Sequence, residues 1–295
     1  METLFRVASN SLFSSVQNPQ NQTFLRFPTS GAVQFSSNSK NWVSLNPQKF
    51  DYLQPFVVSQ NRVSACVNND EKESLNNGVR KKNLAVFVSG GGSNFRAVHL
   101  AILNGDVNGQ FVVLVTNKHD CGGARYAREN GIPVIIYPNT KNEPDGLSSN
   151  DLVAALSMYK IDFILLAGYQ KLIPTELIRA YPNSILNIHP SLLPAFGGKG
   201  YYGKKVHKAV IASGARYSGP TIHFVDENYD MGRILAQRIV PVLANDTAEE
   251  LAARVLCQEH KMYAEVAAAV CEDRVIWRED GVPIIRSKAN PNHYS

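Results

Sequence analysis

Runs of consecutive apolar residues alternate with stretches of helical spacing along most of the chain after residue 81. The apolar runs predict five buried strands, at residues 84–89, 111–116, 133–137, 163–167 and 184–188. The stretches between them predict helices at residues 95–103, 124–129, 151–159 and 175–180. Strands that are apolar at almost every position are typical of parallel sheets with helices on both faces. The alternation therefore predicts an α/β fold, doubly wound around a mostly parallel sheet.

The hydrophobic pattern changes in the last third of the chain. Residues 218–225 and 234–242 alternate between apolar and polar positions and predict a pair of antiparallel strands. Residues 247–270 predict one long helix, opened by a Thr and a Glu at the spacing of a capping box. Residues 274–286 predict a short hairpin. We therefore expect an antiparallel C-terminal extension beside the parallel sheet.

Residues 1–66 show no sustained helical or strand period. They contain eleven serines, five basic residues and two acidic ones, which is typical of an organelle transit peptide. They lack the apolar core of a secretory signal, and residues 63–67 resemble a plastid processing site. We expect residues 1–66 to be a disordered chloroplast transit peptide, 67–81 a polar linker and 82–290 the folded domain. Import into mitochondria, alone or in addition, and a plain disordered tail are the alternatives.

Composition and charge exclude several classes of protein. The 295 residues carry 30 basic and 25 acidic side chains, and this excess is too small and scattered for a nucleic-acid surface. No apolar run approaches the roughly 20 residues that cross a bilayer, so we expect no membrane partner. The four cysteines lack C-x-x-C spacing, and His207 and His223 have no neighbours at ligand spacing. We therefore expect no disulfide scaffold and no metal site.

A glycine loop separates the first predicted strand from the first predicted helix. Residues 90–92 are glycines and are followed by Ser93 and Asn94. Glycines let the backbone approach an anion, and the helix N-terminus directs free N–H groups toward it. Phe95 replaces the third glycine of a dinucleotide-binding motif, and no Gly-Lys-Ser/Thr of a P-loop follows. The loop predicts an anionic ligand other than a dinucleotide, with a tight turn that binds no ligand as the alternative.

The fifth predicted strand ends in a group of polar side chains. It delivers Asn187 and His189 to one face, near the carboxyl end where open α/β sheets bind ligands. An amide beside an imidazole can stabilise an oxyanion and move a proton. Asp226, Glu227 and Asp230 follow the next strand and are the candidates for a carboxylate that orients the imidazole; Asp230 is followed by a tight turn at Met231-Gly232 that can direct it inward. A structural histidine and a solvated turn carboxylate are the alternatives.

Five segments in the same order resemble the phosphoribosylglycinamide formyltransferase family, folate-dependent enzymes of purine synthesis. They are Ser-Gly-Gly-Gly-Ser-Asn at 89–94, Leu-Ala-Gly-Tyr at 166–169, Asn-Ile-His-Pro-Ser-Leu-Leu-Pro at 187–194, His-Phe-Val at 223–225 with Asp230, and Gln-Glu-His at 258–260. The resemblance covers about residues 82–290. It implies a formyltransferase-type, Rossmann-like fold for this domain.

The resemblance also implies an activity. The formyl group of the co-substrate 10-formyltetrahydrofolate passes to the amine of N1-(5-phospho-D-ribosyl)glycinamide in de novo purine biosynthesis, with small molecules as partners and no metal. The implied chain is a monomer or a homodimer. The transfer is direct: Asn187 and protonated His189 donate to the oxyanion, and Asp230 stabilises the imidazolium.

The resemblance assigns two groups of binding residues as well. Those implied for the ribonucleotide are Gly92, Ser93, Asn94, Gln258 and Glu259. Those implied for the folate are Gln170, Lys171, Leu172, Ile173, Asn187, Asp226 and Asp230. Bacterial relatives carry Arg where this sequence has Lys171, and their loop at 195–203 also differs.

Three other functions are weighed against this one. Formyltetrahydrofolate hydrolase shares the catalytic segment but normally has an N-terminal regulatory domain, for which residues 1–80 lack the periodicity. Methionyl-tRNA formyltransferase would need a basic C-terminal domain, which we do not expect here. A noncatalytic nucleotide-binding module is the third alternative. It requires the match at Asn187, His189 and Asp230 to be accidental.

Overall fold

A seven-stranded sheet is the centre of the computed structural model, which describes residues 80–294. Its strand order is β3-β2-β1-β4-β5-β7-β8, and the first five of these pair in parallel. The strands are β1 (Lys82–Val88), β2 (Gly109–Thr116), β3 (Val134–Ile136), β4 (Phe163–Leu166), β5 (Ile185–His189), β7 (Thr221–Phe224) and β8 (Ile234–Gln237). β7 and β8 join the sheet antiparallel. The expected fold class, a mostly parallel α/β sheet with an antiparallel extension, is confirmed. The predicted transit peptide and all but the last two residues of the linker lie outside the described residues.

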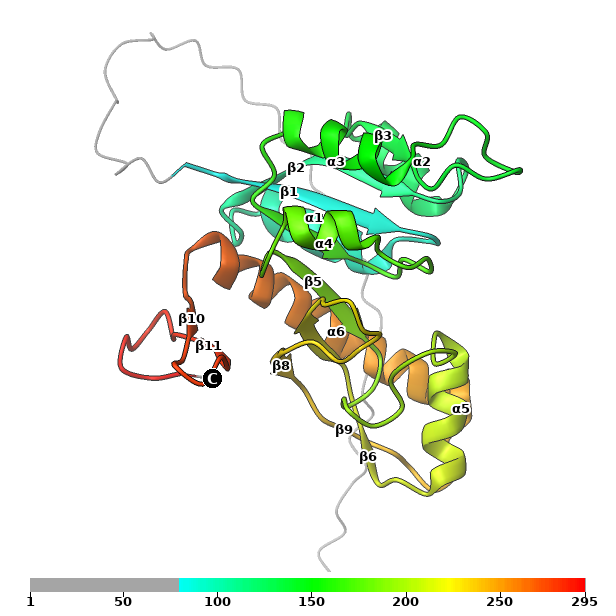
Figure 1. Cartoon of the computed structure of the whole chain (residues 1–295). Helices are drawn as coiled ribbons and strands as arrows, with labels where there is room; N and C mark the ends of the chain where they lie inside the picture. The colour runs from blue at the N-terminus through cyan, green and yellow to red at the C-terminus, as the bar shows by residue number, and fades with distance from the viewer. Residues whose placement is uncertain (1–79, 295) are drawn as a thin grey trace, which may run out of the picture. The chain divides into compact units, whose positions relative to one another are not determined.

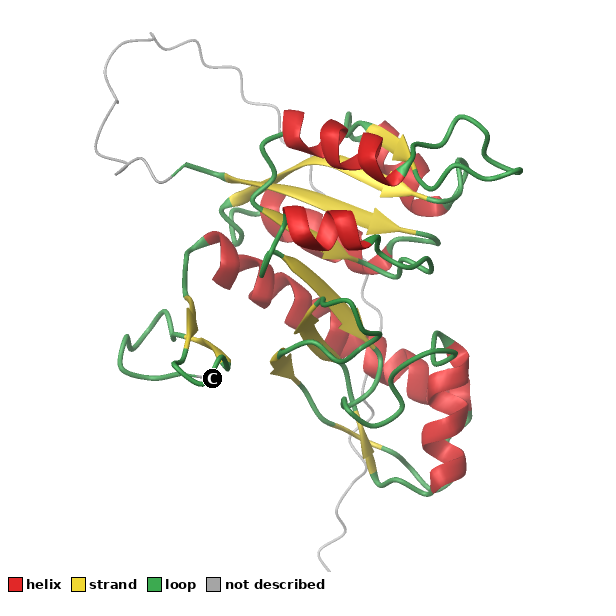
Figure 2. Cartoon of the chain, viewed as in Figure 1, coloured by secondary structure: helices red, strands yellow, loops and turns green. Residues whose placement is uncertain are grey.

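Helices cover both faces of the sheet (Figures 1 and 2). They are α1 (Ser93–Leu103), α2 (Gly122–Glu129), α3 (Ser149–Met158), α4 (Thr175–Ala180), α5 (Lys204–Ser213) and α6 (Ala248–Cys271). The side chains of α1, α2 and α6 share one apolar core with the sheet, and those of α3 and α4 share another. None of the helices between residues 80 and 294 is long and apolar enough to cross a membrane.

The two cores explain the apolar strands. Along β1, Leu84 and Val86 face the core of α1, α2 and α6, whereas Ala85 and Phe87 face the core of α3 and α4. All four side chains are fully buried. Because successive strand residues point to opposite faces, a strand covered on both sides needs apolar residues at every position.

The C-terminal extension differs in detail from the expectation. The predicted strand 218–225 is interrupted at Gly219-Pro220, because proline has no backbone N–H to donate to a ladder. Its first part is β6 (Tyr217–Ser218), which pairs with β9 (Val240–Pro241), and its second part is β7. The predicted strand 234–242 is also divided, at Arg238 and Ile239, into β8 and β9. β10 (Val275–Trp277) and β11 (Pro283–Ile285) form the expected final hairpin.

One helix was not predicted at all. α5 follows the loop after β5, and its buried residues Val206 and Val210 pack with Leu251 and Val255 of α6 in a third, small apolar core. The two fully buried positions of α5 are separated by His207, Lys208 and Ala209, and the helix is only ten residues long, so its local helical signal is weak. Packing on α6 stabilises this helix.

The topology gathers three loops at one edge of the sheet. The neighbouring parallel strands β1, β4 and β5 end beside one another, so the glycine loop, residues 167–174 and the loop after His189 emerge together. This edge is where open α/β sheets bind ligands.

Candidate active site

Asn187, His189 and Asp230 lie together at the end of β5. Asn187 and His189 share the sheet face of α3 and α4, and Asp230 comes from the turn between β7 and β8. His189 Nδ1 is 3.5 Å from Asp230 Oδ2, and the His189 side chain is 5% exposed. Asp230 adopts a left-handed conformation with φ of 53°, which Asp tolerates better than most residues, and this bends the turn toward the histidine. The structure thus brings the expected trio together.

His223, part of the His-Phe-Val motif and discounted as a metal ligand, is a fourth member to which the sequence analysis assigned no role in the site. Its Nε2 is 3.1 Å from Asn187 Nδ2 and 3.6 Å from Asp230 Oδ1. Its Nδ1 is 2.9 Å from Phe224 O, and since a carbonyl only accepts, Nδ1 carries the proton. The amide of Asn187 and the carboxylate of Asp230 thus both face Nε2 of His223. The pairing of Asn187 with His223 in the β5–β7 register is the signal that would have revealed this contact.

The loop after β5 holds both partners of the histidine–aspartate pair through its backbone. His189 Nε2 donates to Phe196 O at 2.9 Å, and Gly198 N donates to Asp230 Oδ2 at 2.8 Å. Gly197 lies between them, where a Cβ atom would collide with the Leu193 side chain and come within 3.2 Å of Asp230 Cβ. A glycine is needed at this position because the loop passes too close to the site for a side chain.

Burial and charge set the protonation of this pair. Burial lowers the pKa of His189, and the charge of Asp230 and the Phe196 carbonyl oppose this effect only in part. Burial alone would raise the pKa of Asp230, but His223, the charge of His189 and the Gly198 amide outweigh it and lower the pKa. At pH 7 the site therefore holds a neutral imidazole beside an ionised carboxylate.

The glycine loop packs against α2 and opens α1. Gly92 is the N-cap of α1 and has a φ of 73°, a conformation that favours glycine. Gly92 is buried and Ser93 is exposed at the helix N-terminus. A Cβ at Gly92 would lie 2.9 Å from Gly123 Cα, so a glycine is also needed for the close contact with α2. The free N–H groups of α1 face the same edge of the sheet as His189.

A buried polar pair joins the glycine loop to α6. Asn94 Nδ2 donates to Glu259 Oε2 at 2.7 Å, and both residues are 8% exposed. Burial raises the pKa of Glu259, and the Asn94 hydrogen bond opposes it. Asn94 Oδ1 is buried without a hydrogen-bond partner. Two residues expected to bind the ribonucleotide, 165 positions apart in sequence, are thus in direct contact.

Other predicted site residues are spread more widely. Gln258 Oε1 accepts from Arg238 Nη1 at 3.3 Å, so its side chain is engaged away from Asn94. Adjacent helix residues point about 100° apart, which explains why Gln258 and Glu259 do not share a partner. Asp226 Oδ1 accepts from Asn228 N at 2.8 Å and closes its own turn.

The segment expected to bind folate, residues 170–173, follows β4. Gln170 and Lys171 are exposed and Leu172 is 57% exposed, whereas Ile173 is buried in the core of α3 and α4. The exposed residues stand beside the end of β5, because β4 and β5 are neighbours in the sheet.

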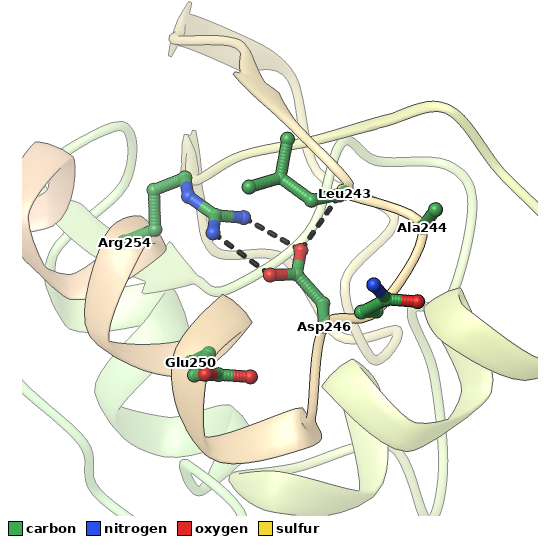
Figure 3. A pocket seen from close by; sticks show the side chains of 6 residues that line it. Leu243, Ala244, Asp246, Glu250 and Arg254 are labelled. Atoms are coloured by element: carbon green, nitrogen blue, oxygen red, sulfur yellow. Dashed lines mark hydrogen bonds and ion pairs between the residues drawn. The ribbon is translucent and has the colours of Figure 1, made fainter. Parts of the chain in front are cut away.

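A hollow of about 300 Å³ lies elsewhere, at the N-terminus of α6 (Figure 3). Asp246 and Arg254 form a two-fold ion pair across it at 2.7 and 2.8 Å, and Leu243 N donates to Asp246 Oδ2. Asp246 and Arg254 neutralise each other, so this ion pair holds the loop before α6 against the helix. The hollow contains none of the predicted site residues.

Groups of three or more metal-ligating side chains are absent from the described residues 80–294. The imidazoles of His189 and His223 are instead engaged by backbone carbonyls, an amide and a carboxylate. The site is thus built for proton transfer and for hydrogen bonding to an oxyanion.

Several known proteins are similar to this chain. The model of the formyl transferase family matches residues 82–267. The chloroplastic phosphoribosylglycinamide formyltransferase of Vigna unguiculata is 71% identical over 216 residues, which are 73% of this chain and 69% of that protein. The corresponding protein of Arabidopsis thaliana is 68% identical over 216 residues, covering 73% and 74% of the two chains. The crystal structure of glycinamide ribonucleotide transformylase 1 from Symbiobacterium toebii is 31% identical with a TM-score of 0.64, and the match covers 72% of this chain and 98% of that one.

Proposed function

This chain belongs to the phosphoribosylglycinamide formyltransferase family, and from this premise we propose that Asn187, His189 and Asp230 carry out its formyl transfer. It is a transferase that formylates phosphoribosylglycinamide in purine biosynthesis, with a formyl-tetrahydrofolate as co-substrate, and it acts in the chloroplast. The observation that supports the catalytic assignment is the convergence of an amide, an imidazole and a carboxylate at the carboxyl end of β5. We further propose that the formyl donor is the 10-formyl isomer.

The chemistry of the transfer follows from bond changes at the formyl carbon. The glycinamide amine attacks this carbon, a new C–N bond forms, and the carbonyl oxygen becomes an oxyanion. Asn187 has two amide N–H groups, of which one donates to His223, so the second is free to donate to the oxyanion. The bond from the carbon to N10 of the folate then breaks, and the electron pair stays on N10.

Proton movement is assigned to His189. The expectation of a protonated imidazole is refined by the lowered pKa of His189, which makes the ring neutral before the reaction. His189 takes up a proton at Nδ1 as the attacking amine loses one, and Asp230, 3.5 Å from Nδ1, stabilises the imidazolium. The Nε2–H group, which donates to Phe196 O, turns to the oxyanion. Nε2 finally gives its proton to N10, so that one proton enters the ring at Nδ1 and one leaves it at Nε2, and protons and charges balance.

The two substrates are assigned to separate binding regions beside Asn187, His189 and Asp230. The ribonucleotide phosphate binds the glycine loop and the N-terminus of α1, where Gly92 and Ser93 present backbone N–H groups. The Asn94–Glu259 pair provides polar atoms for the rest of the ribonucleotide, and Gln258 adds one more. Residues 170–173, with Asn187, Asp226 and Asp230, bind the folate. The assignment of residues 1–66 as the transit peptide and of the chain as a monomer or homodimer stays a prediction.

One experiment tests the transfer against its alternatives. Purified protein is incubated with 10-formyltetrahydrofolate, with and without glycinamide ribonucleotide, and the loss of the formyl group is followed by absorbance. We expect turnover only when the ribonucleotide is present, with its N-formyl product identified by mass spectrometry. Formate release without the ribonucleotide would instead indicate a hydrolase, and binding of both ligands without turnover would indicate a noncatalytic module.

A further inference from the structure

Ser89 occupies the junction between β1 and the glycine loop, and its side chain has no part in the transfer described above. It is 1% exposed. Its hydroxyl donates to Asn117 Oδ1 at 2.5 Å and accepts the backbone N–H of Gln170 at 2.8 Å. Asn117 follows β2 and Gln170 follows β4, so one hydroxyl joins the segments after three neighbouring strands.

Two of the segments that Ser89 joins are proposed to bind different substrates. The glycine loop proposed for the ribonucleotide begins directly after Ser89, whereas Gln170 begins the segment proposed for the folate. The backbone N–H of Ser89 also donates to Gly168 O at 3.3 Å. Ser89 is therefore bonded through its backbone and through its side chain to the loop that leads into the folate segment.

The folate segment, residues 170–173, is held by contacts at its two ends, while the residues between them are exposed. Residues 170–172 are exposed. On one side, the hydroxyl of Tyr169 donates to a backbone carbonyl after β3, and on the other side Ile173 is buried. Within the described residues, the backbone of 170–172 is bonded to the end of β1 through one hydrogen bond, from Gln170 N to Ser89 Oγ. The Ser89 hydroxyl is thus the side-chain contact that connects this segment directly to the strand leading into the glycine loop.

We propose that Ser89 is a positioning residue that sets the folate segment against the glycine loop and so aligns the formyl donor with the ribonucleotide amine. This inference rests on the proposed function, since the two subsites come from it. Reacting groups must approach to about 3–3.5 Å, and a misplacement of about 1 Å can cost on the order of 100-fold in rate. Only a side chain that both donates and accepts can hold Asn117 Oδ1 and Gln170 N together. Threonine keeps this capacity and alanine removes it.

The test compares the wild-type chain with Ser89→Ala and Ser89→Thr in steady-state assays with 10-formyltetrahydrofolate and glycinamide ribonucleotide. We expect Ser89→Ala to raise KM for the folate and to lower kcat, so that kcat/KM for the folate falls about 10- to 100-fold. Ser89→Thr restores kcat/KM to within about threefold of wild type, because the hydroxyl is kept. Binding of the ribonucleotide alone, measured by calorimetry, changes less than about threefold in Ser89→Ala, since the glycine loop keeps its own backbone donors.

Two further variants separate positioning from a general loss of structure. Ser218 is 2% exposed, its hydroxyl has no hydrogen-bond partner, and it lies on β6, so Ser218→Ala is a matched control that should keep wild-type kinetics. Asn117→Ala removes the acceptor of the Ser89 hydroxyl. Its loss should be smaller than that of Ser89→Ala, because the Ser89 hydroxyl still accepts from Gln170 N. The losses should be non-additive in the double variant, because without the Ser89 hydroxyl the Asn117 side chain has no bond to Ser89 left to lose.

Three outcomes would contradict the proposed role of Ser89. A folded Ser89→Ala variant with wild-type kcat/KM for the folate overturns the inference. A loss of ribonucleotide affinity as large as the loss of kcat/KM also overturns it, because the glycine loop itself would then be damaged. If Ser89→Ala does not fold, Asn117→Ala decides alone, and an unchanged kcat/KM there counts against the inference. A wild-type chain without ribonucleotide-dependent turnover contradicts the proposed function instead, so the two failures are distinguishable.

Discussion

At the residue scale, each group of the proposed catalytic trio already has a partner in the protein. Asn187 donates to His223, His189 donates to Phe196 O, and Asp230 accepts from Gly198 N. These contacts hold the polar atoms at the sheet edge, and the second N–H of Asn187 is left for the substrate. Preorganised donors of this kind stabilise an oxyanion without a large rearrangement.

The first prediction concerns the two donors. We expect Asn187→Ala and His189→Ala each to lower kcat by about 100-fold or more, because each removes one hydrogen bond to the oxyanion. Initial rates at saturating substrates measure the effect, and circular dichroism checks the fold. Wild-type rates in folded variants would remove Asn187 and His189 from the mechanism.

The second prediction is the pH dependence. Burial lowers the pKa of His189 below its usual value of 6.5, and the base is active when neutral. The value of kcat/KM should therefore be constant at neutral pH and fall only as the pH drops through that lowered pKa. The charge of Asp230 raises the pKa of His189, so Asp230→Asn should move the acid limb to lower pH as well as reduce the rate. A shift to higher pH would contradict this electrostatic coupling.

At the element scale, α6 connects the proposed ribonucleotide site with the C-terminal extension. Its N-terminus carries the predicted capping box: Glu250 N donates to Thr247 Oγ1 at 3.2 Å, and Thr247 N donates to Glu250 Oε2 at 2.8 Å. These bonds satisfy N–H groups that a helix start otherwise leaves unpaired. The same helix supplies Glu259 to the glycine loop, so its position matters for both regions.

The third prediction tests this cap. Thr247→Ala should lower the free energy of unfolding by about 1 kcal/mol, because the first turn of α6 loses its side-chain acceptor. Urea unfolding at pH 7 measures the difference. Ser157 provides a control, since its exposed hydroxyl bonds within α3 to Ala154 O, and Ser157→Ala should stay within about 0.5 kcal/mol of wild type. Equal losses in the two variants would show that the cap has no special role.

At the scale of the whole molecule, histidines with lowered pKa link stability to pH. Burial lowers the pKa of His99, His189, His207 and His260. Below pH 6.5 the unfolded chain binds protons at these positions more readily than the folded chain does. Stability should therefore fall as the pH drops from 6.5 through the lowered pKa values.

The fourth prediction follows from this linkage. The Tm should decrease between pH 7.5 and pH 5.5, and His207→Asn should make that decrease smaller, because one of the four groups no longer titrates. His119 is a matched control, since its side chain is 61% exposed, and His119→Asn should leave the decrease unchanged. Differential scanning calorimetry at the two pH values checks this. A Tm that rises on acidification would show that the charge repulsion of other groups dominates instead.

Local patterns were sufficient for much of this protein. The continuous apolar runs predicted five strands of the sheet, because strands covered on both faces need apolar residues at successive positions. The Thr–Glu spacing predicted the start of α6, because a capping box involves residues only three positions apart. The strand end and the following turn supplied the candidates, the family resemblance implied the trio of Asn187, His189 and Asp230, and the structure places these residues together.

Other features were decided only by the tertiary structure. α5 forms because Val206 and Val210 find an apolar partner in α6, which the local sequence does not contain. His223 joins the site because the β5–β7 register sets it opposite Asn187, and register depends on the whole sheet. The sequence alone thus determined the strands, the helix cap and the polar residues at the sheet edge. The fold decided which distant side chains meet there, because hydrogen bonds depend on distances of about 3 Å that local patterns do not specify.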